Sequence, residues 1–375
     1  MCRAAKPEPG DKKRAALCLF LGCLYILLTA YFGRTEANTA VTDYPLRARP
    51  EYYHFYIQEA DAWLKGQAEI DVKPDPRLLA MDNPYDRKAR EALGIPYLFD
   101  RALYDGNYYS YFGTAPLLLY FPYYFVFGKF PSLLFIAAVF ALLSLPGLYF
   151  ALRGLLRYYG IRLECLVFVN LYLGLLSGSL IPYMLRCADP YFLPVQAAAF
   201  GLCWLLGASF SALNEKERAG RAGLHFLSAA CGAGVILQSR PQLLLFAGLF
   251  LAPFYLRHLK TRFFTLKEII AQVLCFLLPL SLFFGLTFYY NQLRFSGILD
   301  FGTRYQLTVT DVSDYRLRKD FLLPSFLSSF FTPPEAAPEF PFFRISHFKL
   351  PLDSYLYRGP IMGLMYIPLN WLCLS

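Results

Sequence analysis

The sequence predicts an all-α polytopic membrane protein: a transmembrane helix bundle with a large first loop on one side. Hydrophobic residues make up 57% of the 375 residues and charged residues 17%, whereas soluble domains average about 45–50% and about 25%. Apolar runs of membrane-spanning length recur along the chain, and basic residues gather in the short breaks between them. Both features exclude an ordinary soluble domain.

The spans follow from the rule that a transmembrane helix needs about 20 apolar residues. Eight runs are predicted to cross the membrane: Ala15–Gly33, Leu133–Arg153, Leu163–Tyr183, Tyr191–Leu213, Leu224–Gln238, Leu243–Leu256, Ile269–Tyr290 and Pro360 to the end. The first run is followed by no small-residue cleavage site, which favours a retained anchor over a signal peptide. The last run stops at Ser375, which favours a chain that continues further.

Basic residues predict how these spans are oriented. They cluster before the first span and in alternate breaks: Lys12, Lys13 and Arg14, then Arg153, Arg157 and Arg162, then Lys216, Arg218 and Arg221, then Arg257, Lys260, Arg262 and Lys267. The positive-inside rule places such clusters in the cytoplasm. The net charge of +9 therefore indicates no nucleic-acid partner. We expect a multi-pass protein of the cell membrane with a cytoplasmic N-terminus.

The same rule divides the chain. The expected parts are a cytoplasmic tail (1–14), a first transmembrane helix (15–33), an extracytoplasmic loop with interfacial elements (34–130), a transmembrane bundle (131–290), a second extracytoplasmic segment (291–359) and the start of a further span (360–375).

The segment Thr114–Phe127 is apolar and aromatic but is interrupted by Pro116 and Pro122. If it crossed the membrane, the basic cluster that begins at Arg153 would move outside. We therefore expect it to lie in the outer interface, where tyrosine is favoured because its ring is apolar and its hydroxyl polar.

The first loop is predicted to contain an interfacial helix from Pro50 to Gly66, since proline suits a first helical turn and glycine the position after the last. Its apolar stripe would be Tyr53, Ile57, Ala60 and Leu64, and a neighbouring polar stripe His54, Gln58, Asp61 and Lys65. Such an amphipathic helix would lie along the membrane surface. Its polar stripe would face whatever the loop encloses.

Two further elements are expected in this loop. A helix over Pro84–Leu93 would be capped by Asn83 and closed by Gly94. Asp105-Gly106 is a strong hairpin signal, so strands are predicted within the flanking residues 97–104 and 107–112.

The loop also holds the candidate catalytic acids. Most of its carboxylates are expected to be ordinary solvated or capping groups. Asp61 is the preferred candidate for a base, because it shares the polar stripe with His54 and Gln58, which could contact a substrate. Glu51 and Asp43 remain rivals, since they lie nearer the end of the first span.

Arginines near the outer ends of spans are candidate anion-binding groups. Arg240 lies between two apolar runs, a costly position that often has a function, although a snorkelling side chain explains it equally well. Arg186 and Asp189 occupy the other short outer turn and could pair with each other. Asp189 could instead bind a divalent cation, but one carboxylate specifies little. No other cofactor is indicated.

Arg294 and Arg304 follow the seventh span on the outer side, where the positive-inside rule disfavours arginine. An anionic substrate would explain them. Salt bridges to Asp300 or Asp311 would explain them equally.

The layout resembles the GT-C superfamily of membrane glycosyltransferases, near glycosyltransferase family 39 with its protein O-mannosyltransferases and aminoarabinose transferases. It is most similar to uncharacterised bacterial members. The strings that carry the resemblance are Ala60–Gly66, Asn83–Asp86, Tyr104–Gly113 and Arg294–Tyr305. The paired Asp-Glu usual in family 39 before the first loop helix is not found, so the base stays open among the three acids named above.

The resemblance implies an inverting transfer of a sugar from a polyprenyl-phosphate donor to a glycan, lipid or protein acceptor on the outer face. A lipid phosphate leaves without a general acid, unlike the alcohol in glycoside hydrolysis. One carboxylate then suffices as base, and cations stabilise the departing phosphate.

The alternative is a multi-pass transporter or a lipid or polysaccharide flippase. Such proteins tend to have internal repeats and broken spans. No convincing repeat is found in the sequence. A non-catalytic scaffold is a third class, but it leaves the outer arginines unexplained.

Overall fold

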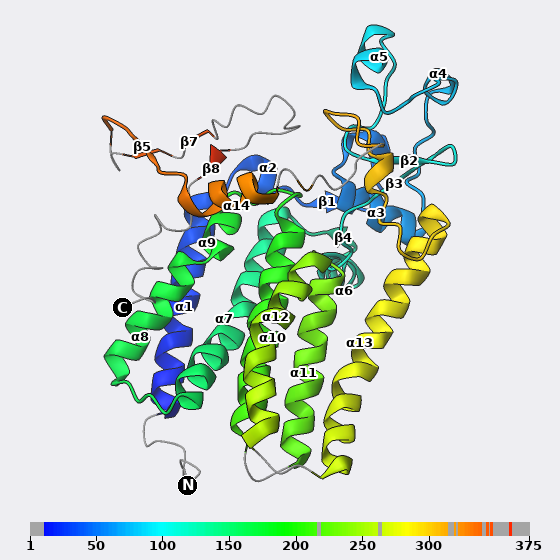
Figure 1. Ribbon diagram of the computed structural model, residues 1–375. Coiled ribbons are helices and arrows are strands. Elements are labelled where there is room, and N and C mark those ends of the chain that lie inside the picture. Colours follow the sequence, from blue (N-terminus) through cyan, green and yellow to red (C-terminus); the bar gives the residue numbers. More distant parts are fainter. Residues whose placement is uncertain are drawn as a thin grey trace.

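The computed structural model describes residues 11–215, 219–261, 265–313, 319, 322–339, 343–344, 346–347 and 360–361. It consists of a bundle of long helices with an irregular head at one end (Figure 1). We call that end the loop end, because the described segments between residues 33 and 133 and after residue 295 lie there.

Long helices form the bundle. Their bounds are α1 Asp11–Gly33, α7 Leu133–Tyr158, α8 Cys165–Gly178, α9 Leu180–Arg186, α10 Leu193–Asn214, α11 Ala219–Leu237, α12 Pro241–Thr261 and α13 Leu266–Phe295. Five of the described helices are long and apolar enough to cross a membrane, or six if the bent pair α8 and α9 counts as one. Each of the first seven predicted spans thus contains helix, and the protein has the features of a multi-pass membrane protein.

The third predicted span is wrong in one respect. A single helix over Leu163–Tyr183 was expected, but α8 and α9 meet at a bend of 51°. Ser179 ends α8 and caps α9, because its Oγ accepts a hydrogen bond from the amide of Ile181 at 3.3 Å. Pro182 lies in the first turn of α9, where its missing N–H costs no helical hydrogen bond.

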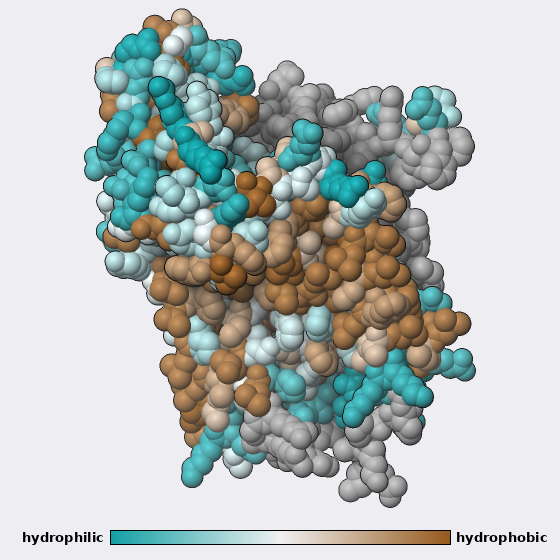
Figure 2. Space-filling model, turned by 180° about the vertical axis from the view of Figure 1, so that it is seen from behind, coloured by the Kyte–Doolittle hydropathy of each residue, from teal (hydrophilic) through white to brown (hydrophobic). Residues whose placement is uncertain are grey.

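The helices pack closely where glycines face one another. A Cβ on Gly207 would lie 2.6 Å from the carbonyl oxygen of Gly147 in α7, and one on Gly232 would lie 2.6 Å from that of Gly201 in α10. Small residues of this kind let membrane helices approach closely. The outward faces of the bundle are apolar, and Figure 2 shows a hydrophobic belt between the hydrophilic head and hydrophilic residues at the lower edge.

The head contains short elements. Before α7 these are α2 Glu36–Thr39, β1 Thr42–Asp43, η1 Pro50–Tyr52, α3 Phe55–Leu64, α4 Pro76–Leu79, α5 Arg87–Ala92, β2 Ala102–Tyr104, β3 Asn107–Tyr109, α6 Leu117–Phe127 and β4 Lys129–Phe130. After α13 they are η2 Thr303–Tyr305, α14 Leu322–Phe331, β5 Glu335–Ala336, β6 Phe343–Arg344, β7 Ser346–His347 and β8 Pro360–Ile361. The strands pair antiparallel as β1–β4, β2–β3, β5–β6 and β7–β8.

The predicted hairpin is confirmed. Strands β2 and β3 are joined by Asp105 and Gly106, whose φ angles are 46° and 72°, as a two-residue hairpin turn with two left-handed residues requires. The predicted helix after Asn83 begins later, at Arg87. Its cap is Asp86, whose carboxylate accepts from the amide of Lys88 at 2.9 Å.

The expected start of a span at Pro360 is wrong for the residues that can be compared. Pro360 and Ile361 form β8, which pairs with β7. Residues 362–375, where the remainder of that span was predicted, lie outside the described residues.

The loop helix α3 differs most from expectation. It begins at Phe55, after the separate turn η1, and it is buried on nearly every side rather than lying along a surface. Phe55 stacks on Phe112 with ring centroids 3.8 Å apart, and the hydroxyl of Tyr56 donates to the carbonyl of Gly113 at 3.0 Å. The polar stripe that was predicted to be open is enclosed by other groups, since Gln58 is hydrogen-bonded to the Pro50 carbonyl and to Arg101.

The apolar segment that was expected in the outer interface forms α6. It is a helix of 11 residues, and at 1.5 Å per residue it is too short for a hydrocarbon core of about 30 Å. It packs against α3, where the Phe121 and Trp63 rings stack at 5.7 Å.

Candidate functional site

A cavity of about 1220 Å³ lies at the loop end of the bundle. It is lined by the end of α3, the segment after the hairpin, the turn between α11 and α12, the end of α13 and the residues that lead into η2. Arg240, Arg294 and Arg304 all line it. The structure thus brings together three predicted arginines that lie far apart in the sequence.

The turn that carries Arg240 is held by the segment after the hairpin. The amide of Ala115 donates to the carbonyl of Gln238 at 3.1 Å, and the hydroxyl of Thr114 donates to the side-chain oxygen of Gln238 at 3.3 Å. Gly113 lies so close that a Cβ would be 2.4 Å from the Gln238 carbonyl oxygen. Glycine permits this approach because it has no side chain.

Arg294 is fixed at the end of α13. Its Nη1 donates to the carbonyl oxygen of Ser110 and its Nη2 to Oδ1 of Asn291, the latter at 2.8 Å. The guanidinium also lies over the Tyr290 ring, 3.9 Å from the centroid. Its buried Nε makes no hydrogen bond with the described residues. The charge is therefore held in place, and only neutral groups accept its hydrogen bonds.

A hydrogen-bonded chain supports the wall of the cavity beside Arg294. The indole of Trp63 donates to the hydroxyl of Tyr290 at 3.0 Å, and that hydroxyl donates to Oε1 of Glu59 at 2.8 Å. Burial raises the pKa of Glu59, although Arg294 and the hydrogen bond from Tyr290 oppose the shift. Glu59 Oε2 is buried without a hydrogen-bond partner among the described residues.

Arg240 and Arg304 are less constrained. Arg240 is half-buried and Arg304 is exposed. Among the described residues, neither guanidinium has a hydrogen bond or an ion pair. Their donors remain available to a ligand in the cavity.

The salt bridges predicted as an alternative for Arg294 and Arg304 are not formed. Asp300 instead accepts hydrogen bonds from the amide of Gly302 at 2.8 Å and from the hydroxyl of Tyr305 at 2.9 Å. Asp311 accepts one from the side-chain amide of Asn83 at 2.7 Å.

An apolar groove of about 570 Å³ adjoins the cavity. It runs between α12 and α13 and is lined by Leu244, Leu245, Gly248, Leu249, Phe284 and Phe288. Four further residues line both spaces: Leu237, Pro241, Leu299 and Phe301. The cavity with three arginines thus shares part of its wall with an apolar groove on the side of the bundle.

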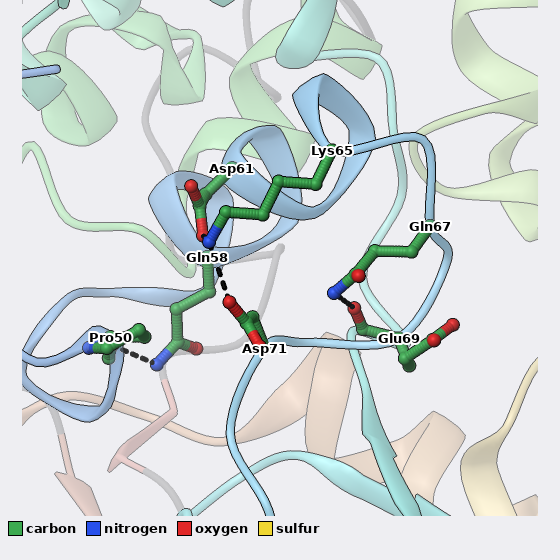
Figure 3. A network of polar contacts seen from close by, with 7 residues as sticks. All are labelled: Pro50, Gln58, Asp61, Lys65, Gln67, Glu69 and Asp71. Carbon is green, nitrogen blue, oxygen red and sulfur yellow. Dashed lines mark hydrogen bonds and ion pairs between the residues drawn. The ribbon is translucent and has the colours of Figure 1, made fainter. Parts of the chain in front are cut away.

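The candidate acids of the first loop do not line this cavity. Asp61 is buried, and Lys65 pairs both with it at 2.9 Å and with Asp71 at 2.7 Å (Figure 3). Because α3 is covered on this face, the carboxylate faces its lysine rather than an open space. The catalytic role predicted for Asp61 gains no support from this position.

Asp43 and Glu51 do not line the cavity either. Asp43 pairs with Lys129 at 3.0 Å and with Arg47 at 3.4 Å, and the hydrogen bond from Lys129 lowers the pKa of its carboxyl. Glu51 lies 3.8 Å from Arg49. Both acids therefore already have cationic partners.

The two polar groups expected to contact substrate beside Asp61 also lie elsewhere. Gln58 is buried: its amide nitrogen donates to the carbonyl of Pro50 at 2.9 Å (Figure 3), and its oxygen accepts from Arg101 at 2.7 Å. His54 precedes α3, and burial together with Arg101 lowers its pKa to about 3. Neither residue lines the cavity.

The turn between α9 and α10 contributes nothing to the cavity. Arg186 is exposed, and it forms no ion pair with Asp189. The carboxylate of Asp189 accepts from the amide of Tyr191 at 2.9 Å, which stabilises its own turn. No group of three or more His, Cys, Asp or Glu residues that could hold a metal occurs within the described residues, so the predicted divalent cation gains no support.

Sequence reasoning missed Glu59, Tyr290 and Asp300 as parts of the site. Glu59 lies on a helix that was expected to be half exposed, and Tyr290 was counted only as the end of a span. Asp300 was considered only as a salt-bridge partner. Its place in the string Arg294–Tyr305, between two outer arginines, was the available signal.

Comparison with known proteins adds no family to this description. No protein-family model matches the chain, and neither a curated protein nor a solved structure matches it.

Proposed function

We propose that the protein is a membrane glycosyltransferase of the GT-C kind. It transfers a sugar from a polyprenyl-phosphate donor to a cell-envelope acceptor, with inversion at the anomeric carbon. The observation that carries this proposal is the cavity lined by Arg240, Arg294 and Arg304, which adjoins the apolar groove between α12 and α13.

The two spaces fit the two parts of such a donor. The arginines offer donors to the phosphate, and guanidinium groups bind phosphate strongly because they form paired, charge-assisted hydrogen bonds. The groove offers apolar side chains to the polyprenyl chain. The cavity, at about 1220 Å³, exceeds the usual range of about 300–1,000 Å³ for small-molecule sites, and so has room for a sugar and an acceptor.

The arrangement also suits the chemistry. Negative charge develops on the phosphate oxygen as its bond to the sugar breaks, and fixed cations lower the free energy of that transition state. Arg294 is already oriented by Ser110 and Asn291, so little reorganisation accompanies the reaction. A phosphate leaving group needs no proton, and one base for the acceptor completes the requirement.

The same proposal gives the protein an orientation. Basic residues gather at the end of the bundle opposite the head, as at Arg153 and Arg257. The positive-inside rule then places the N-terminus in the cytoplasm and the cavity at the outer face of the cell membrane. A donor carried in the outer leaflet would reach the cavity through the groove.

Turnover with defined donors tests the proposal. Purified protein in lipid nanodiscs is supplied with a panel of polyprenyl-phosphate sugars, and release of polyprenyl phosphate is measured. We expect release from at least one donor, and a loss of about 10-fold or more in kcat/KM for Arg240→Ala and for Arg304→Ala. Arg87→Ala, at a partly exposed arginine of α5 outside the cavity, is the matched control.

A flippase is the second candidate, and the bend between α8 and α9 favours it, since broken spans are frequent in transporters. A flippase would move a polyprenyl-phosphate sugar across a vesicle membrane without separating sugar from phosphate. Translocation with no release of polyprenyl phosphate would refute the transferase proposal.

A further inference from the structure

The cavity contains a carboxylate that was not among the predicted catalytic acids. Asp300 is the one acidic residue among the described residues that line it. It follows α13 and lies in a cavity that Arg240, Arg294 and Arg304 also line. None of these arginines is within ion-pair distance of Asp300 in the described part of the chain, so its charge is not neutralised by them.

The Asp300 carboxylate is held in a fixed position. Its Oδ1 accepts from the amide of Gly302 and its Oδ2 from the hydroxyl of Tyr305, while its own amide donates to the carbonyl of Gly297 at 3.0 Å. A carboxylate offers about four acceptor sites, and only two are used. Each oxygen can therefore still accept a proton.

The surrounding turn leaves little freedom for another arrangement. Gly302 has a φ of 73°, and a Cβ there would lie 2.3 Å from the Phe295 ring. Tyr305 packs on that ring and on Tyr104 of the hairpin, with centroids 5.7 Å and 4.7 Å apart. The position of Asp300 thus depends on packing between the hairpin and α13 rather than on a bound ligand.

The other acid near the cavity is less suited to contact a substrate. Glu59 is buried behind Tyr290, to which it is hydrogen-bonded, and does not line the cavity. Its position suits the support of Tyr290 and Arg294. Asp61 is paired with Lys65 outside the cavity.

We propose that Asp300 is the catalytic base of the transfer reaction, an inference that rests on the proposed function. A hydroxyl of the acceptor gives its proton to a carboxylate oxygen of Asp300, and its oxygen forms a bond to the anomeric carbon. The bond between that carbon and the phosphate oxygen breaks, and its electron pair leaves with the polyprenyl phosphate. The proton on Asp300 then passes to water.

The first test removes the base without removing the turn. Asp300→Asn keeps an oxygen for the Gly302 amide, and Asp300→Ala removes the whole group. Both are expected to lower release of polyprenyl phosphate by about 10²–10⁴-fold, the usual contribution of a general base. Asp105→Asn, at the exposed hairpin turn, makes the same chemical change outside the cavity and should leave release unchanged.

The second test distinguishes a base from a structural group. Azide attacks without losing a proton, so it needs no base. Added azide should restore release of polyprenyl phosphate by Asp300→Ala and yield a glycosyl azide of inverted configuration.

The outcomes separate the two proposals. If the wild-type protein turns over and either Asp300 variant stays within about 3-fold of it, the assignment of Asp300 is wrong while the transferase stands. If Asp300→Ala loses release and azide does not restore it, the assignment is also wrong. If the wild-type protein releases no polyprenyl phosphate from any donor, the proposed function is wrong, and the assignment of Asp300 as its base is wrong as well.

Discussion

Adding one methyl group at Gly113 should disturb the cavity without changing any of its three arginines. A Cβ at this position would lie 2.4 Å and 2.5 Å from the carbonyl oxygens of Gln238 and Ser239, and 2.6 Å from the Ser239 Cα. Ordinary contacts to a Cβ begin at about 3.4 Å, so the backbone of one segment has to move by about 1 Å. Overpacking of this kind typically costs about 1–3 kcal/mol.

The consequence for function follows from the place of the contact. Gln238 and Ser239 directly precede Arg240, and the hydrogen bonds from Thr114 and Ala115 to Gln238 hold that turn. Gly113→Ala should therefore displace the arginine as well as destabilise the fold. We expect weaker binding of polyprenyl phosphate, by about 10-fold, alongside a lower apparent unfolding temperature.

Two assays on detergent-purified protein measure these effects: thermal unfolding followed by tryptophan fluorescence, and binding of polyprenyl phosphate. Gly285→Ala in α13 is the matched control, since a Cβ there meets no atom within 4 Å. If Gly113→Ala unfolds at the temperature of the control and binds polyprenyl phosphate as tightly, the proposed close approach between the two segments is refuted.

Three further predictions concern the head and the adjoining end of α13. Burial lowers the pKa of His54 to about 3, so below pH 6.5 the unfolded chain takes up a proton that the folded protein does not. The free energy of unfolding should therefore fall by about 2 kcal/mol from pH 7.5 to 5. His54→Gln should remove that part of the pH dependence of thermal unfolding. Asp61→Asn should lower the unfolding temperature through loss of its pair with Lys65, yet keep wild-type turnover, and a fall of 10²-fold or more would return Asp61 to the catalytic candidates. Tyr290→Phe leaves the buried Glu59 Oε1 without its donor, which should cost about 1–3 kcal/mol in denaturant unfolding; an unchanged midpoint would contradict the described chain.

The membrane-embedded part was predictable because bilayer thickness and hydropathy act along the sequence. Runs of apolar residues gave the location of the long helices, and the turn chemistry of Asp105-Gly106 gave the hairpin. The bend at Ser179 was not predicted, because the length and hydropathy of the run outweighed its breaking signals, Gly178 and Pro182. The break itself depends on one hydroxyl that caps the next helix.

The site was only partly predictable, because its parts meet through tertiary contacts. Arg240, Arg294 and Arg304 could be singled out, since charge at the outer end of a span is costly wherever it occurs. The acids could not be ranked in the same way. Helical periodicity predicted that Asp61 faces an open space. In the structure Asp61 is paired with Lys65, and Gln58 on the same stripe is held by Pro50 and Arg101.

Asp300 shows the opposite failure of sequence-based ranking: an acid that lines the cavity was not chosen as a candidate base. Its place between Arg294 and Arg304 was a signal in the sequence, but it reaches the cavity only because the hairpin packs on the end of α13. Contacts between segments almost 200 residues apart decide which carboxylate shares a cavity with the arginines.

A structure of the protein with bound polyprenyl phosphate would test the central claim most directly. The account predicts the phosphate in the cavity, with oxygens about 2.7–2.9 Å from guanidinium nitrogens of Arg240 or Arg304, and the polyprenyl chain in the groove between α12 and α13. A phosphate bound outside the cavity, or a chain that leaves the groove empty, would contradict it.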